Sequence, residues 1–156
     1  MKLRIVCVGK LSASFFKEGV EEYLARVRRY LACEIVELKE GATRKGDSRQ
    51  TKDREGEAIL GKIPQQAFAV ILDQRGGNLT SEGLADFLAA KMVTGTSEID
   101  FVIGGAYGLS NAVRARADLL LSLSSLTLPH QMVRLLLLEQ LYRGFTIIRN
   151  EPYHNG

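Results

Sequence analysis

The residues of this chain best suited to chemistry gather around its two histidines, and the first of these lies where a loop enters an apolar helix. In "LSLSSLTLPHQM" (121–132), leucine alternates with serine or threonine before a proline, and His130 follows that proline. Main-chain groups and short hydroxyls in such a loop could hold an adenosine-sized ligand, while the leucines line an apolar slot. The same alternation fits a half-exposed strand whose Ser122, Ser124 and Thr127 face water. The pattern alone leaves both interpretations open.

A glycine-rich turn is the second candidate site. "FVIGGAYGLSNAVRARAD" places Gly104, Gly105 and Gly108 between a buried strand and a helix. Glycines let a backbone turn sharply and approach a ligand closely, and a helix start offers free N–H groups; a tight turn without a ligand is the alternative. The spacing matches neither a dinucleotide fingerprint nor a P-loop, and "SSLTL", about 20 residues later, has no carboxylate. We therefore expect neither a nicotinamide enzyme nor a phosphate-cleaving one.

The second histidine lies in the C-terminal segment "RNEPYHNG", where Tyr153 and His154 follow Arg149. Aromatic and imidazole rings can stack on a nucleobase or hydrogen-bond to it. A frayed terminus is the alternative. The segment thus indicates a possible nucleic-acid contact without demonstrating one.

Cysteine and histidine usage excludes several familiar active sites. Two histidines and two separated cysteines cannot build a standard zinc cluster, and no G-x-S-x-G elbow is present for a serine hydrolase. We therefore expect no metal. Cys7 and Cys33 lie next to apolar residues, which favours buried free thiols and a reducing compartment.

The elements that must position these residues alternate between strand-like and helix-like periodicity. This alternation predicts a single α/β domain over residues 1–156, with a parallel sheet covered on both faces. Ser12 or Ser14 is the expected N-cap of the first helix, and a mobile, Gly-rich loop leading into a short helix is expected over 41–62. The expected strands are 3–9, 34–40, 67–73, 98–105 and 120–126; the expected helices are 14–31, 81–93, 109–120 and 130–148, with a turn at 74–80.

Composition is that of an ordinary globular protein. The formal net charge is +3, with no dense Lys/Arg tract that would by itself indicate nucleic-acid binding. We interpret "MKLRIVCVGK" as a first strand rather than a signal peptide, and nowhere do about 18 apolar residues run without a charge. We therefore expect a cytoplasmic protein with no membrane partner.

Taken together, "MKLRIVCVGK", "FVIGGAYGLS", "LSLSSLTLPHQMVRLLLLEQLYRGFTI" and the terminal "EPYH" resemble the RlmH family of 23S rRNA pseudouridine N3-methyltransferases, of the SPOUT class. The resemblance covers essentially the whole chain. It implies a parallel-sheet SPOUT fold with a C-terminal deep trefoil knot, an exception to the rule that chains do not thread their own loops. It also implies a homodimer, and S-adenosylmethionine bound in the knot.

The resemblance further assigns candidate site residues by position. His130 is expected to hold the knotted loop against the last helix, and not to carry the chemistry. Arg143, with Tyr153 and His154 of the tail, is the hypothesised catalytic group for removing the N3 proton and stabilising the developing anion. For contacts to RNA phosphates we expect Arg26, Arg28 and Arg29 on the first helix, together with Arg143 and Arg149; a solvated helix face is the alternative for the first three. The expected cofactor pocket comprises Leu72, Gly104, Gly105, Gly108, Ser124, Ser125, Leu126, Thr127, Leu128 and Pro129.

The implied substrate is 23S rRNA in the assembled ribosome. A dimer would double the basic surface of the chain and could place the tail of one subunit over the cofactor of the other. Two alternatives remain at this stage: a ribosome-binding factor without catalysis, and a SPOUT methyltransferase acting on transfer RNA. The tail ends in "HNG", without the basic residue often found after the histidine in the family.

Overall fold

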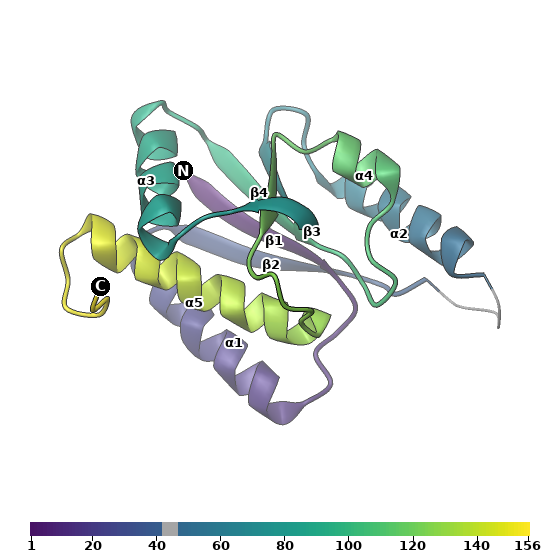
Figure 1. Ribbon diagram of the computed structural model, residues 1–156, viewed down its shortest axis with the longest axis horizontal. Coiled ribbons are helices and arrows are strands. Elements are labelled where there is room, and N and C mark those ends of the chain that lie inside the picture. The colour runs from purple at the N-terminus through teal and green to yellow at the C-terminus, as the bar shows by residue number, and fades with distance from the viewer. Residues whose placement is uncertain (42–46) are drawn as a thin grey trace.

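Strands and helices alternate along the chain in the computed structural model, which describes residues 1–41 and 47–156. The alternation confirms the expected α/β class, because parallel strands need crossover connections. The elements are β1 (Lys2–Val8), α1 (Ser14–Val27), β2 (Ala32–Leu38), α2 (Ser48–Lys62), β3 (Phe68–Asn78), α3 (Ser81–Val93), β4 (Glu98–Ile103), α4 (Asn111–Ala115), β5 (Leu119–Ser122) and α5 (His130–Ile148) (Figure 1).

The described strands form one five-stranded sheet with the order β2-β1-β4-β3-β5, and every neighbouring pair is parallel. In the centre, Ile5 pairs with Ile35 of β2 and with Phe101 of β4. The carboxyl ends of β3, β4 and β5 therefore meet at the same edge of the sheet. In open parallel sheets this edge is where ligands bind.

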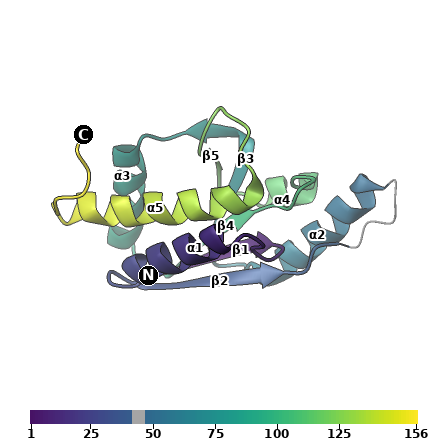
Figure 2. The same ribbon diagram turned by 90° about the horizontal axis from the view of Figure 1, so that it is seen from below.

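Helices cover both faces of the sheet (Figures 1 and 2), as the sequence predicts. Helices α1 and α3 both pack along α5 on one face, while α2 and α4 lie together on the other. Alternate residues of β1 divide between the two layers: Leu3 and Ile5 face α5, and Val6 and Val8 face α2. The sheet is buried on both sides, which explains why its strands read as continuous apolar runs.

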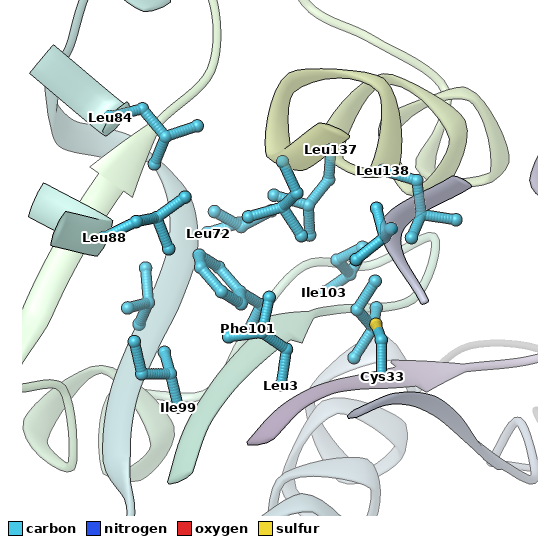
Figure 3. Packing of buried hydrophobic residues seen from close by; sticks show 14 of the residues in the cluster. Leu3, Cys33, Leu72, Leu84, Leu88, Ile99, Phe101, Ile103, Leu137 and Leu138 are labelled. Atoms are coloured by element: carbon cyan, nitrogen blue, oxygen red, sulfur yellow. The ribbon is translucent and has the colours of Figure 1, made fainter. Parts of the chain in front are cut away.

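The larger core lies beneath α5. Leu137 of α5 and Leu88 of α3 point toward Phe101 on the sheet, while Leu138 lies nearer Ile103 (Figure 3); Leu88, Phe101, Leu137 and Leu138 are fully buried. Each such side chain contributes roughly 1.5–3 kcal/mol through burial. Packing in this layer fixes the position of α5, whose first turn borders the sheet edge described below.

Strand β3 is longer than expected, and the predicted turn at 74–80 is wrong. The strand continues to Asn78 and pairs a second time with β5, after a register shift between Leu72 and Gly77. A Cβ on Gly76 would lie 2.6 Å from the backbone carbonyl carbon of Leu120, so only glycine fits there. The Gly-rich sequence therefore marks a bulge and a close backbone approach, not a chain reversal.

Several other boundaries also differ from the expectation. The fifth strand covers Leu119–Ser122 instead of 120–126, and the preceding helix ends at Ala115. Asp118 explains the early helix end, because its carboxylate and its N–H both bond to the backbone of Ala69 in β3. The helix predicted over 109–120 therefore ends at Ala115, and Leu119 and Leu120 belong to β5.

The first two helices show further differences. Helix α1 ends at Val27, and its N-cap is Ala13 with no capping side chain. Ser12 instead bonds to Gln131 of α5, so the serine cap prediction is wrong. Helix α2 is 15 residues long rather than short, and Asp47 caps it by accepting from the Gln50 N–H. The expected mobile loop falls largely on residues 42–46, which lie outside the described residues.

Both cysteines are buried free thiols, as predicted. Burial raises the pKa of each to about 11. Among the described helices, none is long and apolar enough to cross a membrane. The deep knot that the resemblance implies stays a prediction.

Candidate functional site

A cavity of about 590 Å³ opens at the carboxyl edge of β3, β4 and β5. The volume suits a ligand of cofactor size. Three segments form its walls: residues 72–75 at the bend of β3, the turn 103–109 after β4, and the loop 121–130 leading into α5. The two sequence motifs therefore belong to one site, although about 20 residues separate them along the chain.

Every residue expected to hold the cofactor lines this cavity except Ser125, whose side chain is exposed. The described cavity also includes residues that sequence reasoning did not assign. Those additional residues include Asp73, Gln74, Arg75, Tyr107, Leu109, Arg114, Leu121, Leu123, His130 and Val133.

Hydroxyl groups hold the loop before α5 through local hydrogen bonds. Ser122 Oγ donates to the Ser124 carbonyl (2.9 Å), and Ser124 Oγ accepts from the Leu126 N–H (3.0 Å). Asn78 at the end of β3 donates to the Ser122 carbonyl (3.0 Å), and Gln74 donates to Thr127 Oγ1. Ser122 is buried, so the simple interpretation of a half-exposed strand is wrong for it. These bonds keep the loop open around the cavity and leave other main-chain groups for a ligand.

An ion pair closes one side of the cavity. Arg114 Nε donates to Asp73 Oδ2 at 2.8 Å. Burial alone would raise the pKa of Asp73, but hydrogen bonds from the Arg75 backbone N–H and from Arg114 hold it below its usual value. Neither residue was expected at the site, since a lone Asp after a strand and an Arg on a short helix carry no distinctive spacing.

His130 lies at the first position of α5 and lines the cavity. Its Nε2 atom is buried and has no hydrogen-bond partner among the described residues. A ligand that enters the cavity could supply the partner that this buried polar atom lacks. The cavity therefore combines apolar surface, free main-chain groups and a polar atom in need of a partner, which fits the adenosyl cofactor expected from the sequence.

The three expected catalytic residues also come together, but elsewhere. Arg143 lies over the Tyr153 ring, with Cζ 4.7 Å from its centroid, and its NH1 is 3.3 Å from His154 Nδ1. The Tyr153 hydroxyl donates to Glu139 Oε1 at 3.0 Å, and His154 Nε2 lies 3.0 Å from Glu82 Oε1. The C-terminal segment is therefore docked on α5 and α3, and the frayed terminus is excluded.

The environment of this cluster raises the pKa of two of its side chains, Tyr153 and Arg143. Burial, followed by hydrogen bonds to Tyr23 and Glu139, raises the pKa of Tyr153, so the phenol keeps its proton at neutral pH. The hydrogen bond to Glu139 raises the pKa of Arg143. Of the three side chains, the His154 imidazole is the one with a ring nitrogen lone pair, which a general base needs.

The cavity includes His130 and Val133 at the start of α5, whereas the chain leaves α5 for the tail at the other end of the helix (Figure 1). At about 1.5 Å per residue, the 19 residues of the helix span about 28 Å. None of Arg143, Tyr153 and His154 lines the cavity. Arg143 follows His130 by 13 residues, about 20 Å along the helix axis, so in the described arrangement these side chains lie outside the cavity of their own chain.

The expected RNA-binding arginines gather near the tail. Helix α1 runs parallel to α5, since Gly19 packs on Leu135 and Tyr23 on Tyr142, so both helices end beside the tail. Arg26 pairs with Glu22 and lies 5.0 Å from the Tyr23 ring centroid. Arg28, Arg29 and Arg149 are exposed. No group of three or more potential metal ligands gathers within the described parts of the chain.

Comparison with known proteins agrees with this geometry. The sequence model of one protein family, described as "Predicted SPOUT methyltransferase", matches residues 1–154. A protein of Syntrophotalea carbinolica named ribosomal RNA large subunit methyltransferase H is 53% identical over 155 residues, covering 99% of each chain. A protein of the same name from Geotalea daltonii is 46% identical over 156 residues, covering 99% of this chain and 100% of its own.

The fold also has a solved counterpart. The crystal structure of tRNA (m1G37) methyltransferase from Aquifex aeolicus superimposes with a TM-score of 0.54 at 16% identity, covering all of this chain and 76% of that one. At this identity the likeness concerns the fold alone. The family match and the full-length relatives confirm the resemblance seen in the sequence motifs: the chain belongs to the SPOUT methyltransferase family, among the ribosomal RNA large subunit methyltransferases H.

Proposed function

We propose that this protein transfers a methyl group from S-adenosylmethionine to N3 of a pseudouridine in 23S rRNA, within the assembled ribosome. The observation that carries the proposal is the cavity built from the glycine turn and the serine-rich loop, in a chain whose relatives are full-length rRNA large subunit methyltransferases. The donor methyl is already activated by its sulfonium, so the protein has to align the attack and exclude water. Such a substrate would place the reaction in the cytoplasm.

A homodimer would bring the cavity of one chain together with the tail of the other. Arg143 lies about 20 Å from His130 along α5, and none of the three catalytic candidates lines the cavity of its own chain, so a second copy is a source of a tail at each cavity. Apolar side chains exposed near the start of α5 support a contact there: Phe15, Leu126 and Met132 are 65%, 73% and 40% exposed. We infer that each active site combines the cofactor pocket of one subunit with the tail of the other.

Within this composite site, the three tail-cluster residues divide the work. His154 takes the N3 proton, and Arg143 stabilises the negative charge that develops on the base. Tyr153, which stays protonated, orients Glu139 and donates a hydrogen bond. Arg143 donates to His154 Nδ1, so in the described arrangement Nε2 carries the proton that faces Glu82; the base function requires Arg143 to exchange its contact with Nδ1 for the base.

The same dimer would present RNA with a basic rim. Arg28, Arg29 and Arg149 are exposed close to the tail and would contact phosphates on either side of the modified nucleotide. Arg26 pairs with Glu22 and lies over the rings of Tyr23 and Tyr142, so we expect it to contribute less to RNA binding than the other three. Loss of an exposed arginine should weaken binding and reduce its salt dependence.

The primary experiment is transfer of labelled methyl to ribosomes from a strain that lacks this modification, followed by mapping of the labelled nucleotide. We expect label at one pseudouridine of the large-subunit RNA. Label found in transfer RNA, or no transfer with intact cofactor binding, would overturn the proposal and favour a transfer RNA enzyme or a ribosome-binding factor.

The composite site has a separate test by subunit mixing. The pocket variant is Gly104→Val. Its new side chain should clash with Leu109, whose Cδ2 lies 2.8 Å from the position of an added Cβ. A tail variant carries His154→Ala. Each alone should be inactive, whereas co-expressed chains should regain about a quarter of wild-type activity, because half of the dimers are mixed and each mixed dimer has one intact site. No recovery in verified mixed dimers would show that pocket and tail act within one chain.

A further inference from the structure

A buried carboxylate stands directly behind the glycine turn and takes no part in the chemistry proposed above. Glu55, on α2, is 5% exposed. Its Oε1 accepts from the Gly41 N–H at 3.2 Å, and its Oε2 is buried without a partner among the described residues. Burying an ionisable group without a counter-charge is costly, so a position of this kind calls for a functional explanation.

Only backbone separates this carboxylate from the cofactor cavity. Gly105 lines the cavity, and a Cβ added to it would lie 2.9 Å from Glu55 Oε2 and 3.3 Å from Oε1. A side chain at 105 would therefore displace the carboxylate or move the turn. The next residue of α2, Gly56, fits just as closely on Ser110, where its added Cβ would come 2.4 Å from the hydroxyl. Close packing of helix α2 therefore places the Glu55 carboxylate directly against the glycine turn at Gly105.

The reaction removes one positive charge from the ligand in this cavity. The donor S-adenosylmethionine carries a sulfonium, and loss of its methyl leaves a neutral thioether, whereas the ammonium and carboxylate of the amino acid part are unchanged. A negative charge behind the cavity wall attracts the donor more than the product.

Resting on the proposed function, we propose that Glu55 is a specificity-determining residue: its carboxylate behind Gly105 makes the pocket prefer the charged methyl donor over the uncharged product. The preference would help product leave after transfer. Glu55 touches neither reactant, so it acts through the field it places on the pocket.

The groups around Glu55 determine when it carries a charge. Burial and Glu40 raise the pKa of Glu55, while the Gly41 N–H and His130 lower it; burial is the largest of these effects. The carboxylate is therefore formed at a higher pH than for an exposed glutamate. The preference for the donor should increase as the pH rises through this titration.

Calorimetric titration with S-adenosylmethionine and with S-adenosylhomocysteine, at pH 8, tests the proposal. We expect Glu55→Gln to weaken donor binding about ten-fold, equivalent to ~1.4 kcal/mol, and to change product binding less than two-fold. The control is Glu57→Gln, two residues along the same helix and exposed to solvent, which should change neither. Equal weakening of both ligands would indicate a packing role alone, and would overturn the proposal, as would no change in either.

A second measurement uses the wild-type protein, in case Glu55→Gln does not fold. The ratio of product to donor dissociation constants should increase from pH 5 to pH 8; a flat ratio contradicts a titrating counter-charge. Wild-type protein that binds neither ligand would refute the proposed function itself. Wild-type protein that binds both without a Glu55-dependent preference would refute only this inference.

Discussion

Arg134 provides the sharpest test of how the fold holds the pocket in place. This residue of α5 is 1% exposed, and its guanidinium joins two strand ends: NH1 donates to Glu37 Oε2 at 2.8 Å, and NH2 donates to the Gly9 carbonyl at 3.0 Å. His130, one helical turn earlier, and Val133, directly before Arg134, line the cofactor cavity. Replacing Arg134 should therefore affect both the stability of the fold and the affinity of the pocket.

The magnitude follows from what each substitution leaves behind. Glu37 is 41% exposed, so water can solvate it once the arginine is gone, and the loss of the ion pair itself costs little. The buried Gly9 carbonyl would lose its donor, at about 1–3 kcal/mol. Arg134→Ala also removes the packed aliphatic stem, for a total of about 3 kcal/mol. Arg134→Met keeps the stem and should cost about half as much.

Thermal and urea unfolding at fixed protein concentration measure the effect. For a chain of this size, about 3 kcal/mol corresponds to a decrease in Tm of about 6–12 °C, with a smaller decrease for Arg134→Met. Donor binding should weaken several-fold in both variants, because the first turn of α5 loses its anchor. An Arg134→Met protein as stable as wild type, with unchanged donor affinity, would refute the reasoning by showing that the guanidinium is dispensable.

Three further outcomes are expected. Burial raises the pKa of Asp100 from 3.8 to about 6 despite its pairing with Arg4. The folded state therefore favours the protonated carboxyl, and this contribution to the free energy of unfolding is fully present below pH 3.8. About 3 kcal/mol of it is lost as the pH rises through 6. Asp100→Asn should flatten this dependence in urea titrations between pH 4 and 7, and an unchanged slope would contradict it. Gly76→Ala should destabilise the fold by about 1–3 kcal/mol, because its Cβ would meet the backbone of β5 at 2.6 Å; calorimetry of the variant decides, and wild-type stability would mean that β3 and β5 can separate without cost. Cys7 and Cys33, with their pKa values near 11, should react with iodoacetamide at pH 8 far more slowly in the folded protein than in urea, and equal rates would show that the core opens readily.

Local sequence signals predicted much of this molecule. Strand and helix periodicity predicted the α/β alternation, and the glycine turn and the serine-rich loop predicted a cavity that the structure forms from both. Where a prediction from local signals was wrong, a contact between residues distant in the sequence determined the structure instead. The Gly-rich end of β3 reads as a turn but pairs with β5, and the predicted helix 109–120 ends early because Asp118 bonds to Ala69 in the neighbouring strand.

The sequence by itself determined the order of the elements, the apolar faces that pack them and the two motifs that shape the pocket, because periodicity and turn chemistry act over a few neighbouring residues. Only the tertiary structure decided which distant groups meet. It brought Glu55 against Gly105, docked His154 beside Glu82, and placed Arg143, Tyr153 and His154 outside the cavity. These placements depend on strand order and helix packing, which make neighbours of residues 50 and 72 positions apart, and no pattern within a short window encodes that distance.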